Sequence, residues 1–242
     1  MCRKRGFAVE PAKSPLKHPR IAREMKKKAP EMPDFSYEDA ALARGHAVIC
    51  GIDEAGRGPW AGPVVAGAVI LERATLPGDL VLDLDDSKKL KPARREELFE
   101  RLARHARIGI GRAEVAEIDE INILQATMLA MARAVDDLGG GGAAAGQPGL
   151  ALVDGNREPE LACPVQCVVR GDGISLSIAA ASIVAKVTRD RIMAALALAY
   201  PAYGWERNAG YGTRHHQDAL AAHGVTPEHR RSYAPIRKIL GL

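Results

Sequence analysis

Residues 51–59, which read GIDEAGRGP, constrain the fold and chemistry of this chain more than any other stretch. Two adjacent carboxylates, Asp53 and Glu54, stand where an apolar run breaks into glycines. Because neighbouring side chains on a strand point to opposite faces, these two acids can converge only where the strand ends or bends. Gly56 and Gly58 permit such a bend and let a partner's backbone approach closely. The stretch therefore predicts paired acids beside a tight turn.

Acids next to a glycine turn suit the chemistry of a phosphodiester. Carboxylate oxygens bind hard divalent cations, and such cations neutralise the charge of a phosphate. Arg57 and the free N–H groups of the turn can hold phosphate oxygens. An isolated Asp-Glu pair is more often part of a plain surface turn, so the interpretation depends on the rest of the chain.

Length and composition indicate one globular domain. The 242 residues suffice for one hydrophobic core, and 47% hydrophobic and 26% charged residues are typical of a soluble protein. No apolar run approaches the roughly 20 residues that span a bilayer, and no apolar segment follows the N-terminal charges as in a secretory signal. We therefore expect a cytoplasmic protein without a membrane partner, whose four cysteines are reduced packing residues: Cys2, Cys50, Cys163 and Cys167.

The N-terminal region is strongly basic, unlike the rest of the chain. Residues 1–33 hold ten Lys or Arg and three Glu, a net charge of +7, so the overall +4 leaves −3 for residues 34–242. Prolines and the lack of an amphipathic period predict disorder in this region. We expect a basic, disordered extension over residues 1–45 and one domain over residues 46–242. The extension is either a solvated leader or an arm that binds phosphates.

The order of apolar runs and breakers predicts a mixed sheet with helices packed on it. We expect strands at 47–53, 64–71, 108–115, 150–153 and 165–169, and helices at about 92–105, 121–138 and 176–199. A Gly/Ala-rich loop is expected at 139–149. Three of the strands end at or near an acid, namely Asp53, Asp154 and Asp172. If these strands are neighbours, the acids gather at one edge of the sheet.

Together with Glu54, the three strand-end acids provide four carboxylates. Four are enough to hold two divalent cations about 4 Å apart, an arrangement that stabilises the attacking and leaving oxygens of a phosphoryl displacement. Asp154 in Asp-Gly-Asn and Asp172 in Gly-Asp-Gly are also compatible with ordinary turns. Only the conjunction of the acids is specific.

Several segments around these acids follow one another in a characteristic order: 53–63, 86–90, 117–124, 154–156, 178–190, 210–213 and 229–233. In sequence and in order they resemble the bacterial ribonuclease HII family, over about residues 47–242. The resemblance implies a ribonuclease H-like α/β fold with a mixed five-stranded sheet flanked by helices and a C-terminal helical extension. It also implies an endonuclease that cuts the RNA strand of RNA–DNA hybrids, including single ribonucleotides embedded in duplex DNA. The sequence does not determine the oligomeric state, and we expect a monomer.

The family's metal-binding acids correspond to Asp53, Glu54 and Asp154, and its fourth catalytic acid to Asp172. The resemblance therefore implies a dependence on Mn²⁺ or Mg²⁺, with two ions in the catalytic complex. It also implies cleavage that leaves 5′-phosphate and 3′-hydroxyl ends. One departure is Ile174, where the family often has a basic residue, which puts one contact to the substrate backbone in question.

The resemblance further assigns the substrate-binding residues. Gly56, Arg57 and Gly58 match the family loop that reads the ribose 2′-hydroxyl, the group that distinguishes RNA from DNA. Tyr211 matches the aromatic residue that stacks on the sugar across the RNA–DNA junction, although a lone tyrosine here would more often be packing. Lys186, on the expected helix 176–199, is a candidate phosphate contact.

Other functions fit parts of the pattern. A nuclease of the same fold with another substrate, such as a junction resolvase or a transposase-type enzyme, would share the acids but not the loop 56–58. A nucleotide-binding module would use Gly56, Gly58 and Ala61 as a dinucleotide loop, which must lie between a strand and a helix N-terminus. Residues 63–65 lead instead into a strand. A hybrid-binding protein without activity would not need all the acids.

Overall fold

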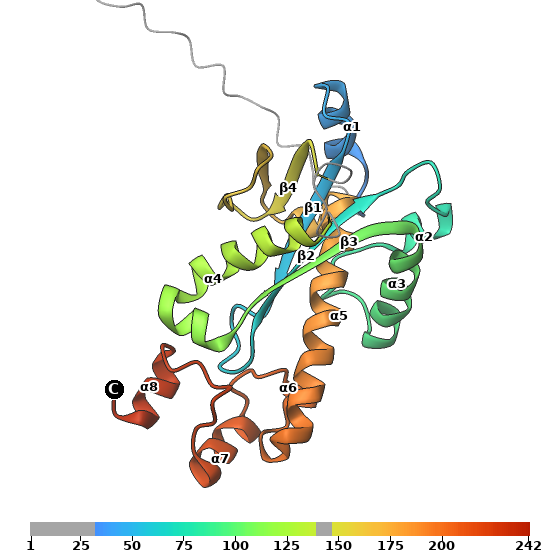
Figure 1. Ribbon diagram of the computed structural model, residues 1–242. Coiled ribbons are helices and arrows are strands. Elements are labelled where there is room, and N and C mark those ends of the chain that lie inside the picture. Colours follow the sequence, from blue (N-terminus) through green and yellow to red (C-terminus); the bar gives the residue numbers. More distant parts are fainter. Residues whose placement is uncertain (1–31, 139–146) are drawn as a thin grey trace, which may run out of the picture.

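The computed structural model describes residues 32–138 and 147–242, whose helices and strands form a layered α/β arrangement (Figure 1). A five-stranded sheet has the order β3-β2-β1-β4-β5. Since β1 pairs antiparallel with β2 and parallel with β4, the sheet is mixed, and the predicted fold class is confirmed. The strands are β1 (Ile49–Ala55), β2 (Val64–Leu71), β3 (Ala106–Ala113), β4 (Leu150–Asp154) and β5 (Val165–Val168).

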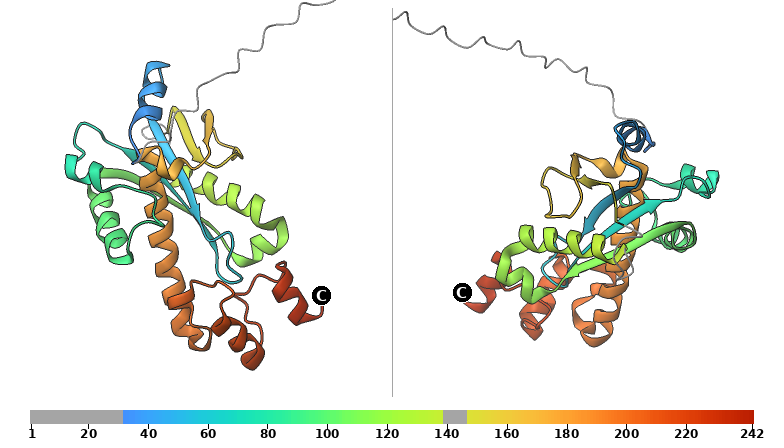
Figure 2. Two further views of the ribbon diagram at one scale, coloured as in Figure 1. Left: turned by 180° about the vertical axis from the view of Figure 1, so that it is seen from behind. Right: turned by 45° about the horizontal axis from the view of Figure 1, so that its top comes forward.

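Helices cover both faces of this sheet (Figure 2). Ala66 and Ala68 of β2 belong to the apolar core under α4, whereas Val69 and Leu71 belong to the core shared by α3 and α5, because alternate residues of a strand face opposite ways. The helices are α1 (Ser36–Ala43), α2 (Gly78–Asp83), α3 (Pro92–His105), α4 (Val115–Leu138), α5 (Leu176–Ala199), α6 (Trp205–Asn208), α7 (Arg214–His223) and α8 (Ala234–Leu240), with short 3₁₀ turns η1 (Gly171–Gly173) and η2 (Pro201–Tyr203).

Small residues bring α5 close to the central strands. Ala179, Ala180 and Ala181 are fully buried, and a Cβ added to Gly67 of β2 would come within 2.6 Å of the Ala181 carbonyl oxygen. Only glycine fits at that distance. This packing fixes α5, which supplies Lys186, relative to β2 and its neighbour β1.

The folded body begins earlier than the sequence predicts. The expected disordered extension runs to residue 45, but residues 36–43 form α1, which lies near the start of α5 (Figure 1). The buried Glu38 carboxylate accepts hydrogen bonds from Ser175 Oγ at 2.6 Å and from the Ser177 backbone N–H at 2.9 Å. These bonds satisfy donors at the N-terminus of α5, which explains why α1 is anchored. The tail at residues 1–31 and most of the expected loop 139–149 lie outside the described residues.

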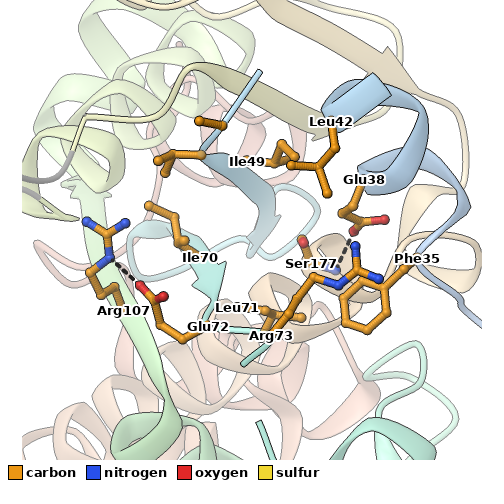
Figure 3. A pocket seen from close by; sticks show the side chains of 12 residues that line it. Phe35, Glu38, Leu42, Ile49, Ile70, Leu71, Glu72, Arg73, Arg107 and Ser177 are labelled. Carbon is orange, nitrogen blue, oxygen red and sulfur yellow. Dashed lines mark hydrogen bonds and ion pairs between the residues drawn. The ribbon is translucent and has the colours of Figure 1, made fainter. Parts of the chain in front are cut away.

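A small pocket lies where α1 meets the ends of β1 and β2 (Figure 3). Its floor includes Ile49 and Ile70, and an ion pair between Arg107 Nε and Glu72 Oε1, 3.1 Å long, lies at one side. None of the residues predicted to act on a substrate lines this pocket. We assign it to the junction of α1 with the body.

Helix α4 is longer than predicted and kinked. It begins at Val115 instead of residue 121, and Asn122 interrupts it with φ 68° and ψ 164°. Asn122 Oδ1 accepts the N–H groups of Leu124 at 2.9 Å and Gln125 at 3.2 Å. The asparagine thus caps the second part of the helix, and the predicted start at 121 coincides with this internal cap.

The C-terminal helical extension has its own apolar core, which includes Trp205 and Ile236. It is joined to the sheet domain through the backbone of Trp60. The backbone N–H of Trp60 donates to Gly210 O, and its carbonyl oxygen accepts from the backbone N–H of Arg230, both at 2.8 Å. The turn that carries Tyr211 is therefore held beside the loop that follows β1. None of the helices in the described ranges is long and apolar enough to cross a bilayer.

Two neutral histidines form part of the extension's core. The Nε2 atoms of His216 and His229 are 2.9 Å apart, and His229 Nδ1 accepts the backbone N–H of Thr226 at 3.0 Å. His229 therefore carries its hydrogen on Nε2, and His216 donates its own Nδ1–H to the Tyr211 carbonyl oxygen at 2.9 Å. Burial and the neighbouring His216 lower the pKa of His229 to about 4.

Acid should therefore destabilise the fold through His229. As the pH falls below 6.5, the ordinary pKa of histidine, His229 becomes protonated in the unfolded chain. In the folded chain it stays neutral until about pH 4. At pH 5 this residue alone should cost about 2 kcal/mol of unfolding free energy. Urea unfolding at pH 7.5 and 5.0 should show a smaller acid loss for His229→Gln than for the wild type; equal losses would contradict the neutral pair.

Candidate active site

Neighbouring parallel strands bring three acids together. Asp53 and Asp154 follow the last paired positions in the register of β1 with β4. Asp172 lies in η1 after β5, and the Gly171 N–H donates to Asp154 Oδ1 at 2.6 Å. One carboxylate oxygen from each of the three acids lies within 4.8 Å of the other two. The predicted gathering of acids at one edge of the sheet is thus present in the structure.

Glu54 occupies a different place from the one the sequence predicts. β1 does not end at Asp53 but runs to Ala55, because residues 53–55 pair with β2. On a continuing strand the side chains of Asp53 and Glu54 alternate, so Glu54 is absent from the close group of three. Its Oε1 lies 3.4 Å from Arg57 Nη1. Glu54 still lines the same pocket as Asp53 and Asp154.

The group of acids is electrostatically strained. Burial, reinforced by the charges of Glu54 and Asp154, raises the pKa of Asp53 well above its ordinary value. Burial and the charge of Asp172 likewise raise the pKa of Asp154, and burial raises the pKa of Glu54 despite Arg57. Like charges close together in a poorly hydrated site repel one another. A bound cation would relieve this repulsion.

Lys88 is a residue of the site that the sequence interpretation missed. Its Nζ lies 3.1 Å from Asp172 Oδ2. Partial burial lowers the pKa of Lys88, but the hydrogen bond and charge of Asp172 raise it overall. Residues 86–90 read as a polar turn, and no local pattern shows that this turn meets an acid 84 positions further on. The ammonium group lies where a substrate phosphate could also contact it.

The glycine turn lies next to the acids. Gly56 has φ 103° and, on the other side of the turn, a Cβ added to Gly58 would come 3.3 Å from Cε1 of Tyr211. The Tyr211 ring itself is half exposed. The same pocket brings together three of the four predicted acids, the turn and the predicted aromatic residue; its lining comprises Asp53, Glu54, Ala55, Gly56, Arg57, Gly58, Ser87, Lys88, Asp154, Lys186, Arg189 and Tyr211.

Lys186, which the sequence suggests as a phosphate contact, lines this pocket, but its charge is not isolated. Its Nζ lies 2.6 Å from Asp190 Oδ1, and Asp190 Oδ2 also lies 3.4 Å from Arg95 Nη2. Asp190 therefore forms an ion pair with Lys186 and does not belong to the group of Asp53, Asp154 and Asp172. Ile174, the departure noted in the sequence, is partly buried against the apolar cluster that includes Leu152 and Ile178.

The dinucleotide-binding interpretation fails on geometry. A phosphate loop of that kind must open a helix, whose N–H groups hold the pyrophosphate. Here residues 59–63 lead into β2, which begins at Val64. The carboxylates in front of the turn would also repel a pyrophosphate.

The acids fit the divalent metal ions that the fold implies. Their donor atoms are carboxylate oxygens, the ligands preferred by Mg²⁺ and Mn²⁺. The group is buried but opens to a pocket, so phosphate oxygens could complete the coordination. The raised pKa values of Asp53 and Asp154 are those of acids arranged for a counter-charge.

Comparison with known proteins agrees with this geometry. The family model described as Ribonuclease HII matches residues 50–236. A ribonuclease HII of Paramagnetospirillum magneticum is 60% identical over 209 residues, which cover 86% of this chain and 99% of the relative. A ribonuclease HII of Rhodospirillum rubrum is 57% identical over 211 residues, covering 86% of this chain and 92% of the relative.

Solved structures show the same architecture. The crystal structure of ribonuclease H2 from Pyrococcus horikoshii matches with a TM-score of 0.63 and 28% identity, covering 79% of this chain and 96% of that one. Bst-RNase HIII in complex with Mn²⁺ shares the fold at 18% identity, with a TM-score of 0.64 and coverage of 91% of this chain and 76% of that one. The chain therefore belongs to the ribonuclease HII family and is a ribonuclease H, an endoribonuclease whose metal-dependent reaction hydrolyses the RNA strand of RNA–DNA hybrids.

Proposed function

We propose that this ribonuclease also nicks duplex DNA at single embedded ribonucleotides, as a first step in their removal. It cuts on the 5′ side of the ribonucleotide and leaves 5′-phosphate and 3′-hydroxyl ends. The observation that supports this most is that Asp53, Glu54 and Asp154 line one pocket with the turn 56–58 and Tyr211. Recognition of one ribose and cleavage at the adjacent phosphate thus require no rearrangement between distant parts.

Asp53, Asp154 and Asp172, together with Glu54, are the acids that we assign to the reaction. The first three would share the metal ions, and Glu54 would join them once it leaves Arg57, 3.4 Å away. Two Mg²⁺ or Mn²⁺ ions held by these acids would supply the positive charge that stabilises the attacking and leaving oxygens of a phosphoryl displacement. Lys88 would exchange Asp172 for a substrate phosphate, and Lys186, held by Asp190, would contact the neighbouring one.

The turn 56–58 has the donors that recognition of a ribose requires. In the part of the chain that the structure describes, the backbone N–H groups of Arg57 and Gly58 donate to no acceptor. A 2′-hydroxyl can accept from such a group, and a DNA sugar cannot. The half-exposed ring of Tyr211 lies against Gly58, where it can stack on a sugar.

The proposal is tested with a duplex that carries one ribonucleotide. We expect nicking in Mg²⁺ or Mn²⁺ on the 5′ side of that ribonucleotide and none with excess chelator. An all-DNA duplex of the same sequence should stay intact. Cleavage of the all-DNA duplex would favour the resolvase or transposase-type alternative, and cleavage in chelator would overturn the metal assignment.

Tyr211→Ala should weaken cutting at an isolated ribonucleotide by about 10-fold or more, because the stacking surface for the sugar is lost; for comparison, stacking of a base on an aromatic side chain is worth roughly 1–3 kcal/mol. Binding of duplex in general should change less. The melting temperature should hardly move, since the ring is half exposed. Equal losses on every substrate together with a lowered melting temperature would show that Tyr211 only packs.

We also propose that the chain acts as a cytoplasmic monomer and that its basic N-terminal tail touches phosphates. Support for a monomer comes from the pocket, whose acids and turn are all supplied by one chain. Support for the tail comes from its net charge of +7 over residues 1–33. A single-chain mass for the complex in solution would agree with the first proposal.

Deletion of residues 1–31 should weaken hybrid binding and flatten its dependence on salt. Each phosphate that the tail neutralises contributes about −0.9 to the log–log slope. The position of the cut and the need for a 2′-hydroxyl should survive, because charge alone carries no such information. Superimposable salt titrations of full-length and truncated protein would make the tail a solvated leader.

A further inference from the structure

Two arginines are buried where the turn 56–58 joins the rest of the molecule. Arg230 is fully buried and Arg189 is 1% exposed. Among the described residues, neither guanidinium has a carboxylate within ion-pair distance. A buried charge without a counter-charge is costly unless its hydrogen bonds are satisfied. Both side chains must therefore be held by something other than an acid.

Arg230 is held by the backbone of the turn itself. Its Nη2 donates to Gly56 O at 2.6 Å, Gly62 O at 2.8 Å and Pro63 O at 3.1 Å, and its Nη1 donates to Arg57 O at 3.0 Å. Its Nε donates to Gly62 O at 2.9 Å. One side chain thus engages four carbonyl oxygens along residues 56–63.

Arg189 joins the turn to the segment of Tyr211. Its Nε donates to Pro63 O at 3.0 Å, its Nη2 to Ala61 O at 3.1 Å and its Nη1 to Ala209 O at 3.0 Å. Ala209 lies two residues before Tyr211 and has a positive φ of 47°. The guanidinium therefore couples two segments that are about 150 residues apart in sequence but border the same pocket.

The electrostatic environment agrees with a purely hydrogen-bonding role. Burial and the neighbouring Arg230 lower the pKa of Arg189 to about 10, and burial lowers the pKa of Arg230 as well. Both groups stay protonated at neutral pH and donate through every N–H that faces a carbonyl. Lysine would keep the charge but lose the planar fork that reaches several oxygens at once.

The orientation of the turn follows from these bonds. A peptide group whose carbonyl oxygen points into the protein directs the N–H on its other side outward. Arg230 donates to the carbonyl oxygens of Gly56 and Arg57. The Gly56 carbonyl shares its peptide group with the N–H of Arg57, and the Arg57 carbonyl shares its peptide group with the N–H of Gly58. Those two N–H groups face away from the guanidinium and have no acceptor in the described ranges.

We infer that Arg189 and Arg230 are positioning residues that aim the N–H donors of the turn 56–58 at the ribose and set their distance from Tyr211. The inference rests on the proposed reading of the ribose by this turn. Tyr233 belongs to the same arrangement, because its hydroxyl accepts from Arg230 Nη1 at 2.9 Å and donates to the Arg57 carbonyl. The chain thus preorganises a donor pair with two buried cations whose own N–H groups are taken up by carbonyl oxygens.

The test measures binding preference in Ca²⁺, without cleavage, for a duplex with one ribonucleotide over the same duplex in all-DNA form. Arg230→Lys should reduce the preference by about 10-fold, and Tyr233→Phe, which leaves the core packing intact, should reduce it by a smaller factor. Leu98→Ala in the core of α3, far from the turn, is the control for lost stability. It should lower the melting temperature and keep the preference.

Hydrogen exchange supplies a readout that is independent of substrate. A peptide covering residues 54–63 should exchange faster in Arg230→Lys and in Tyr233→Phe but not in Leu98→Ala. Unchanged preference and unchanged exchange in Tyr233→Phe and Arg230→Lys would overturn the inference. A wild type with no preference at all would instead overturn the proposed reading of the ribose, and the inference would fall with it.

Discussion

Replacing Asp53 or Asp154 by asparagine is expected to reduce turnover by at least about 1,000-fold, equivalent to roughly 4 kcal/mol of transition-state stabilisation. The amide has nearly the shape of the carboxylate but not its charge, so it is a poor ligand for a hard cation. Hybrid binding should remain measurable, because Lys88 and Lys186, which we propose as phosphate contacts, are untouched. Single-turnover rates and binding titrations on each variant measure the two effects separately.

The melting temperature distinguishes the loss of a metal ligand in these variants from a general loss of folding stability. Since burial and neighbouring acids raise the pKa of Asp53, its charged form is disfavoured in the fold, and a neutral amide should leave the melting temperature in chelator equal or higher. Asp83→Asn is the control, because Asp83 pairs with Arg94 and Arg101 outside the pocket. That variant should keep its activity. Near wild-type rates for either active-site variant would refute the assignment of the acid group.

The convergence of the acids could be predicted from sequence because it depends on local signals that add up. Asp53 and Asp154 each follow an apolar run, and parallel neighbouring strands place their ends at one edge. Glu54 shows the limit of the same signal. Glycines show where a strand is able to turn, but they do not show where it ends. β1 continues to Ala55 because residues 53–55 pair with β2, and such pairing depends on the partner strand.

Other features depend on contacts between distant parts of the chain. The anchoring of α1 through Glu38 requires the N-terminus of α5, more than 130 residues away. Lys88 meets Asp172 only because the loop before α3 folds over the sheet edge. Arg230 lies in segment 229–233, which carries part of the family resemblance, but its partners are backbone carbonyls that no residue type reveals. Composition and periodicity carry no information of this kind.

Gly56→Ala is expected to displace the turn 56–58 itself and so to have a large effect on recognition of the ribose. The residue has φ 103°, which L-residues rarely adopt, and its new Cβ would overlap the Arg189 side chain and lie 2.9 Å from Pro63 O. The backbone strain alone costs about 1–3 kcal/mol. Because Arg189 cannot move without releasing Ala61 and Ala209, the turn must shift instead.

A shifted turn should lower kcat/KM on a single embedded ribonucleotide by about 100-fold and abolish the preference over all-DNA duplex. Gly78→Ala is the matched control, since Gly78 has an ordinary φ and no atom lies within 4 Å of its added Cβ. It should behave as wild type in melting temperature, rate and preference. If Gly56→Ala also kept its preference, the 2′-hydroxyl would have to be read elsewhere, because no ribose contact made by this turn could tolerate both the backbone strain and the shift of the turn.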